Sequence, residues 1–257
     1  MTEEEEQVLR TLRNAVERAK RTSVALPVQL VRSREYGADA ELARLLRGDR
    51  DDRPGRGGAV RLKLYLTLVM RATRHPHHLD PMPAYHYAKL LGLPDPMGGG
   101  RRRITQALAW LDREGFIKLV GRGRGSSPTI KVKRVYKTRG YDGPPFVRVP
   151  SEMWTNGWIV HLSGRAVALW IVLKELTGSK KAPGGAWATG EHKDQYGLSA
   201  DTWTRATRDL VDAGLLEVEP VIERPDFGQE RRRQKYRLLE ARLQRNAFTN
   251  RKGPATP

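Results

Sequence analysis

Lysine and arginine residues are concentrated in two segments that also have the features of β-hairpins. Between Phe116 and Tyr141 there are eight basic residues and no acidic residue, and a second basic run covers residues 231–237. Guanidinium and ammonium groups bind phosphate oxygens, and glycine allows the backbone to approach a phosphate closely. The candidate phosphate contacts are Arg122, Arg124, Lys131 and Lys133 in the first segment, and Arg231, Arg232, Arg233 and Lys235 in the second.

Polar side chains suited to reading nucleic-acid bases lie on two predicted helices. In each helix, apolar residues at helical spacing define one buried face, which leaves the polar residues on the opposite face. Arginine and glutamine form paired hydrogen bonds with guanine and adenine edges. The candidates are Arg101, Arg102, Arg103, Thr105 and Gln106 on the first helix, and Thr202, Thr204, Arg205 and Arg208 on the second.

A cluster of histidines offers a different chemistry. His75, His77 and His78 precede Tyr85 and Tyr87. This faintly resembles the two-histidine and tyrosine arrangement of rolling-circle replication nucleases, in which the histidines lie on a central strand. Here Pro76 interrupts the histidines, and proline is confined to strand edges. A helix end is therefore the favoured interpretation. No metal site, cofactor, nucleotide-binding loop or catalytic residue is predicted.

The overall charge indicates a polyanionic partner. Forty-seven Lys and Arg residues against 29 Asp and Glu leave a formal net charge of +18 in 257 residues. Such an excess repels itself unless a polyanion compensates it, which favours nucleic acid. The chain has no cysteine, its N-terminus is acidic, and no apolar run is long enough to span a bilayer. We therefore expect a cytoplasmic protein, associated with the nucleoid or a plasmid, that makes no membrane contact.

The chain divides into four regions. Residues 1–22 form an amphipathic helix that Thr2 caps, and this helix packs either on the body or on a second copy in a homodimer. Residues 23–140 and 141–239 form two domains, separated by a glycine- and proline-rich linker. Residues 240–257 are predicted to be a disordered basic tail.

The two domains have the same order of predicted elements. The first has helices at 59–74, 84–91 and 101–114, followed by strands at 116–120 and 130–136. The second has helices at 164–176, 190–196 and 200–213, capped by Ser163, Thr189 and Ser199, and then strands at 215–218 and 231–238. Gly115 and Gly214 end the third helix of each domain.

The register between the two domains is specific. Counted from the two glycines, Ile104 corresponds to Trp203, and Leu111 corresponds to Leu210. The segment before each domain also recurs, because residues 24–27 (Val-Ala-Leu-Pro) resemble residues 147–150 (Val-Arg-Val-Pro). The sequence therefore predicts a tandem repeat.

Residues 104–119 and 203–218 resemble the recognition helix and following strand of the winged helix-turn-helix superfamily. The resemblance covers roughly residues 24–239 and implies an α+β, mainly helical protein with two tandem winged helix-turn-helix domains. Tandem pairs of this kind resemble plasmid replication initiators and bacterial or phage DNA-binding regulators. The glycine insertion at 97–100 departs from the family pattern by lengthening the turn before the first recognition helix.

The resemblance implies a non-enzymatic, sequence-specific double-stranded DNA-binding protein of a bacterium or mobile element. Its role would be replication initiation or transcription regulation. Two alternatives stay open at this point. One is a metal-dependent strand-nicking initiator that uses Tyr85 or Tyr87. The other is a winged-helix adaptor that binds protein or RNA, although the low aromatic content (7%) disfavours a base-stacking surface.

Overall fold

The computed structural model describes residues 1–33, 38–47, 57–73, 75–121, 127–133, 145–178, 185–188, 190–223 and 231–249. Within these ranges the chain is an α+β structure, mainly helical, with small antiparallel sheets. This agrees with the predicted fold class at the level of secondary structure. No helix in the described ranges has both the length and the apolar character needed to cross a membrane.

One order of elements occurs twice after the N-terminal helix α1 (Glu3–Ala19). The order is one strand, three helices, one strand, two helices and two strands. The first series consists of β1 (Ser23–Pro27), α2 (Val28–Val31), α3 (Glu41–Arg47), α4 (Gly58–Arg71), β2 (His78–Leu79), α5 (Ala84–Leu90), α6 (Gly99–Arg113), β3 (Ile117–Val120) and β4 (Thr129–Val132). The second consists of β5 (Phe146–Pro150), α7 (Glu152–Thr155), α8 (Trp158–His161), α9 (Gly164–Thr177), β6 (Ala186–Trp187), α10 (Gly190–Tyr196), α11 (Ala200–Asp212), β7 (Leu216–Glu223) and β8 (Arg231–Leu238).

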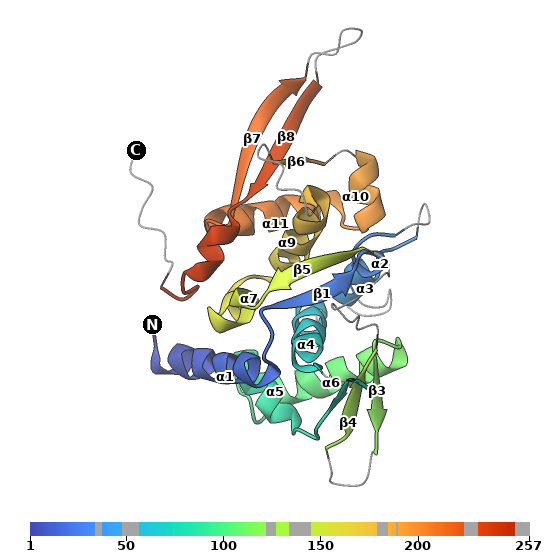
Figure 1. Cartoon of the computed structure of the whole chain (residues 1–257), viewed down its shortest axis with the longest axis vertical. Helices are drawn as coiled ribbons and strands as arrows, with labels where there is room; N and C mark the ends of the chain where they lie inside the picture. Colours follow the sequence, from blue (N-terminus) through green and yellow to red (C-terminus); the bar gives the residue numbers. More distant parts are fainter. Residues whose placement is uncertain are drawn as a thin grey trace.

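The two series also form sheets of the same topology. The first sheet has the strand order β2-β4-β3 and the second has the order β6-β8-β7, with every neighbouring pair antiparallel. The hairpins β3–β4 and β7–β8 project from opposite ends of the molecule (Figure 1). The short strands β2 and β6 were not predicted, because two residues are too few to show an alternating pattern.

The first strands of the two series pair with each other. β1 and β5 form an antiparallel two-stranded ribbon in which Ala25 lies opposite Arg148. The sequence similarity of these segments therefore reflects one shared structural unit. The ribbon lies across the middle of the molecule, between the two hairpin ends (Figure 1).

The two series share one hydrophobic core. Helices α4 and α9 occupy the same position in the two series and pack against each other. A Cβ atom on Gly164, at the start of α9, would lie 2.6 Å from the Cα atom of Ala59. The indole Nε1 of Trp154 on α7 also donates a hydrogen bond to Thr67 Oγ1 on α4, at 3.1 Å. Apolar residues from both series therefore form a single buried cluster.

The predicted register is confirmed where the structure describes it. Ile104 and Trp203 are both buried, as are Leu111 and Leu210. Gly115 and Gly214 have φ angles of +73° and +69°, so each ends its helix in the left-handed conformation that glycine adopts without strain. The predicted cap Thr189 lies outside the described residues.

Helix α6 begins earlier than predicted, at Gly99 rather than at Arg101. The side chain of Asp95 accepts hydrogen bonds from the amides of Gly98 and Gly99, at 3.1 and 2.6 Å. The glycine insertion is therefore the N-terminal cap and first turn of α6. A prediction based on apolar periodicity missed it because these residues are not apolar.

The N-terminal helix packs within the chain. Thr2 and Glu5 form the reciprocal cap of α1, and the apolar stripe that includes Leu9, Leu12 and Val16 is buried. Helix α1 contacts α4, α5 and α7. The stripe is thus covered without a second copy, and dimerisation through α1 stays a prediction.

The prediction of a disordered tail from residue 240 is wrong for residues 240–249. Residues Glu240–Gln244 form a short 3-10 helix, and Leu243 and Ala247 are buried. The indole Nε1 of Trp158 donates to the carbonyl oxygens of Leu243 and Arg245, at 3.1 and 3.0 Å. This indole holds in place a polar segment whose own sequence shows no clear helix or strand pattern. Residues 250–257 lie outside the described residues.

Candidate nucleic-acid interface

Helix α6 presents a basic and polar surface. Its apolar residues face α4 and α5, and the predicted candidates on the other side are exposed. These are Arg101, Arg102, Arg103, Thr105 and Gln106. The Thr105 hydroxyl donates to the carbonyl of Arg101 at 3.0 Å, so its oxygen can still accept a hydrogen bond. Among the described residues, no carboxylate forms an ion pair with any of the three arginines.

Helix α11 presents a more mixed surface. Thr204, Arg205 and Arg208 are exposed, as predicted. Arg205 Nε forms an ion pair with Asp201 Oδ1 at 2.8 Å, one helical turn earlier. Thr202 is only half exposed, and its amide donates to the cap residue Ser199. The Arg205 guanidinium must therefore share its donors between Asp201 and any base that it reads.

One carboxylate ties α11 to the body of the protein. Asp209 accepts hydrogen bonds from Arg165 Nε at 2.9 Å and from the Ser163 hydroxyl at the start of α9. Burial by itself would raise the pKa of Asp209, but these hydrogen bonds and the positive charges of Arg165 and Arg208 hold it below its usual value. The ionised carboxylate therefore fixes the orientation of α11 at neutral pH.

In the described strands of the first hairpin, the basic side chains face no carboxylate across the sheet. Lys118 on β3 lies directly opposite Lys131 on β4, and His78 on β2 lies on the other side of Lys131. All three side chains are exposed, as is Lys133. Like charges opposite each other on neighbouring strands destabilise a sheet. A bound anion would relieve this repulsion.

The second hairpin pairs part of its basic charge with glutamates. Across the β7–β8 register, Glu217 faces Arg237 and Glu219 faces Lys235. Arg237 forms an ion pair with Glu217, and the amine of Lys235 lies 5.9 Å from the centre of the Trp187 ring. Arg233 faces the apolar Val221. The sequence interpretation considered only the basic strand and missed the alternating glutamates opposite it.

Some predicted contact residues cannot be placed. Arg122 and Arg124 lie outside the described residues. Arg231 and Arg232 have a described backbone in β8, but their side chains do not belong to the described part of the structure.

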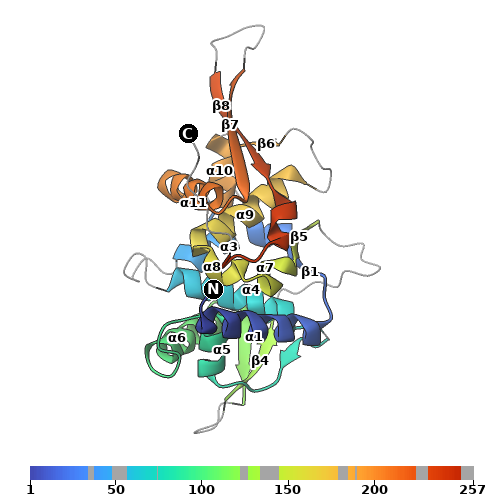
Figure 2. The same cartoon turned by 90° about the vertical axis from the view of Figure 1, so that its left-hand side faces the viewer.

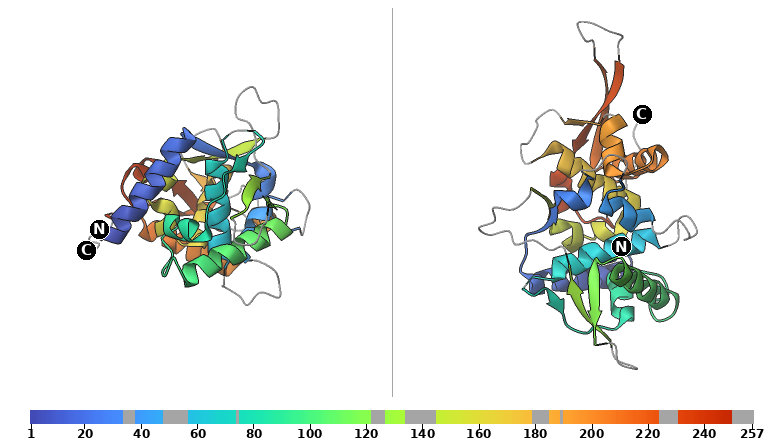
Figure 3. Two further views of the ribbon diagram at one scale, coloured as in Figure 1. Left: turned by 90° about the horizontal axis from the view of Figure 1, so that it is seen from below. Right: turned by 90° about the vertical axis from the view of Figure 1, so that its right-hand side faces the viewer.

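The two candidate helices lie on the same face of the molecule. Figure 2 shows α6 and α11 along the same edge, away from the β1–β5 ribbon, and the right-hand view of Figure 3 shows the same arrangement from the opposite side. Their exposed residues point away from the shared core. One face thus carries both polar helices, with a hairpin beyond each.

Tyr87, one of the two tyrosines of the nicking alternative, is poorly placed to act as a nucleophile. The Tyr87 side chain is completely buried, and the guanidinium of Arg71 lies 5.5 Å from its ring centre. Burial raises the pKa of Tyr87, with Arg71 opposing this shift, so the nucleophilic phenolate is disfavoured. Among the described residues, no group of three or more His, Asp or Glu side chains is placed to hold a metal ion.

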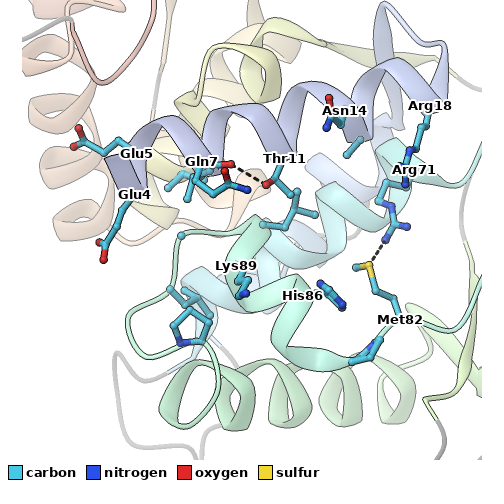
Figure 4. A pocket seen from close by; sticks show the side chains of 18 of the residues that line it. Glu4, Glu5, Gln7, Thr11, Asn14, Arg18, Arg71, Met82, His86 and Lys89 are labelled. Atoms are coloured by element: carbon cyan, nitrogen blue, oxygen red, sulfur yellow. Dashed lines mark hydrogen bonds between the residues drawn. The ribbon is translucent and has the colours of Figure 1, made fainter. Parts of the chain in front are cut away.

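A groove of about 1440 Å³ lies along α1 and α5. Glu4 and Glu5 lie at one end of it, whereas Arg18 and Arg71 lie at the other, and Lys89 and His86 come from α5 (Figure 4). Acidic and basic side chains therefore line the same groove. This mixture does not provide the uniform positive surface that a polyanion requires.

Comparisons of the chain with protein-family models, with characterised proteins and with solved structures gave no match.

Proposed function

We propose that this protein is a sequence-specific double-stranded DNA-binding protein whose two repeats are winged helix-turn-helix units. The order of three helices, a glycine and a returning hairpin, present in both series, supports this assignment. The observation that carries the proposal is that α6 and α11, with their exposed Arg, Gln and Thr side chains, share one face of the molecule.

The two units contribute differently in this proposal. The first unit supplies most of the phosphate affinity, because Arg101, Arg102, Lys118 and Lys131 have no acidic partner among the described residues. Released counterions make this contribution strongly salt-dependent. The second unit contributes mainly base reading through Arg205 and Arg208, because Glu217 and Glu219 already face Arg237 and Lys235 of its hairpin.

The biological outcome of binding is proposed to be replication initiation or transcription regulation in a bacterium or mobile element. Both require a protein that recognises a duplex sequence, and neither requires a chemical step by this chain. Mapping the bound sites on the source DNA would separate the two roles. Repeated sites beside an AT-rich tract are expected for an origin, and one site over a promoter is expected for a regulator.

The difference in charge between the two hairpins allows a direct test of the proposal that the first unit supplies most of the phosphate affinity. Fluorescence anisotropy with a labelled random duplex, over a series of salt concentrations, measures the slope of log K against log salt. The Lys118→Ala/Lys131→Ala variant should reduce the magnitude of this slope by up to about 1.8, because each phosphate contact contributes about 0.9.

The matched control is Lys235→Ala/Arg237→Ala, which removes the same formal charge from the second hairpin. Because Glu219 and Glu217 already face these side chains, the slope should change by less than half as much. Equal effects of the two variants would contradict the assignment of phosphate affinity to the first unit. A wild-type protein that binds single-stranded RNA more tightly than duplex DNA would contradict the proposed function itself.

A further inference from the structure

The ribbon β1–β5 contains a local two-fold axis. In the sequence repeat, Val24 corresponds to Val147 and Pro27 to Pro150, which makes Ala25 the counterpart of Arg148. In the structure Ala25 and Arg148 are also paired across the ribbon. An antiparallel pair of equivalent strands in which a residue faces its own counterpart has a two-fold axis between those two residues.

The rest of the molecule follows the same axis. Helices α4 and α9, which are counterparts, pack against each other near their first residues, where Gly164 contacts Ala59. In Figure 1 the axis points towards the viewer through the ribbon, and counterpart elements lie on opposite sides of it. Helix α5 lies opposite α10, and the hairpin β3–β4 lies opposite β7–β8. Helices α6 and α11 are therefore related by rotation about an axis perpendicular to the face that they share.

We infer that the DNA element bound by one chain consists of two half-sites in inverted orientation that differ in sequence. This inference rests on the proposed function and specifies its substrate. Recognition elements related by a two-fold axis read the two strands of a duplex in inverted order, as in symmetric dimers. Because both helices lie on one face, the half-site centres are separated by a whole number of turns, about 10 base pairs per turn.

The half-sites differ because the exposed residues of the two helices differ at counterpart positions. Thr105 and Thr204 are equivalent and identical. Gln106 corresponds to Arg205, and Ala109 corresponds to Arg208; all four are exposed. Glutamine pairs with adenine and arginine with guanine. At these two positions α6 offers an adenine contact where α11 offers guanine contacts, and the complete element is therefore an imperfect palindrome.

The test is selection of bound sequences from a library of random duplexes by the full-length protein. Wild-type protein should enrich an imperfect inverted repeat. The Gln106→Arg/Ala109→Arg variant gives α6 the same exposed residues as α11 at these positions. It should enrich a more symmetric element and bind a perfect palindrome of the α11 half-site at least about tenfold more tightly than wild type does.

The matched control is Gln7→Arg/Asn14→Arg, which adds the same charge at exposed positions of α1, away from the shared face. This variant should enrich the wild-type element. Circular dichroism checks that both variants are folded, and each changes exposed side chains alone.

The possible outcomes distinguish a failure of the inverted half-site inference from a failure of the proposed function. Enrichment of direct repeats or of a single half-site overturns the inference and leaves the proposed function intact. So does a variant of α6 that selects the same asymmetric element as wild type. Absence of duplex binding, or binding that enriches no sequence, overturns the proposed function. An inverted element that becomes symmetric in the α6 variant supports both.

Discussion

Lys63 is a half-buried basic residue that belongs to neither of the exposed basic surfaces described above. It lies on α4, and its amine donates a hydrogen bond to the carbonyl oxygen of Val160 at 2.9 Å. Burial and, to a smaller extent, the positive charge of Arg103 together lower the pKa of Lys63 to about 8. The charged form of this residue therefore destabilises the folded state at neutral pH.

This burial predicts a pH dependence of stability. The folded-state pKa lies below the usual value of 10.5, so between pH 8 and 10.5 the unfolded state binds more protons than the folded state. The contribution of Lys63 to the free energy of unfolding should rise across this window, by about 3 kcal/mol in total. Below pH 8 both states are protonated and the contribution is constant.

Urea unfolding of wild type and Lys63→Met at several pH values from 7 to about 10.5 measures the effect. The free energy of unfolding of wild type should rise relative to that of the variant as the pH increases. Lys89→Met, which removes the same charge from an exposed position, is the control and should follow wild type. Parallel curves for wild type and Lys63→Met would contradict a depressed pKa.

At the scale of elements, the contact between α4 and α9 depends on glycine. An added Cβ at Gly164 would lie 2.6 Å from both the Cα and the Cβ of Ala59, and backbone cannot be moved aside as a flexible side chain can. The counterpart Gly58 is equally constrained, because a Cβ there would overlap the carbonyl oxygen of Leu46. Both series therefore begin this central helix with a residue that has no side chain.

The Gly164→Ala variant should lower the free energy of unfolding by about 1–3 kcal/mol, the usual cost of overpacking a close contact. Gly99→Ala is the matched control, because its Cβ would meet Asp95 Oδ2 at an ordinary distance of 3.5 Å. Alanine should be neutral or slightly stabilising in that helical position. Equal denaturation midpoints for Gly164→Ala and wild type would show that the two helices can separate at no cost.

The hairpins illustrate how two elements of the same topology acquire different properties. Both follow their candidate helix through a left-handed glycine. In the first, Lys118 and Lys131 face each other, whereas in the second the corresponding pair is Glu217 opposite Arg237. The basic residues of a strand therefore indicate an anion-binding surface only when the residues opposite them are known as well.

At the scale of the whole molecule, the shared core predicts a single unfolding transition. The β1–β5 ribbon and the α4–α9 contact join the two series, so neither can lose its packing without exposing apolar surface of the other. Tryptophan fluorescence reports mainly on the second series, because five of the six tryptophans follow residue 150. Far-UV circular dichroism reports on both series.

The two probes should therefore give coincident urea transitions. Separate midpoints, with fluorescence and ellipticity changing at different urea concentrations, would mean that the repeats unfold independently. The Gly164→Ala variant extends the measurement, because weakening the α4–α9 contact should move both transitions together.

Local sequence was sufficient for the features that depend on neighbouring residues. Helical spacing of apolar residues located α6 and α11, and the apolar segments at 59–74 and 164–176 located α4 and α9. Side-chain oxygens identified the caps Thr2, Ser163 and Ser199. The two glycines aligned the repeats in register. The exposure of the polar residues on α6 and α11 followed from the same periodicity, because a helix with one buried face must expose the other.

Tertiary structure decided what depends on residues far apart in the chain. The pairing of β1 with β5, the short third strands and the ordered segment 240–249 all require partners more than 45 residues away. The common face of α6 and α11 arises from the same cause, because it is set by the axis between Ala25 and Arg148. Periodicity describes which side of one element is buried; the orientation of two elements relative to each other is fixed by the contacts between them.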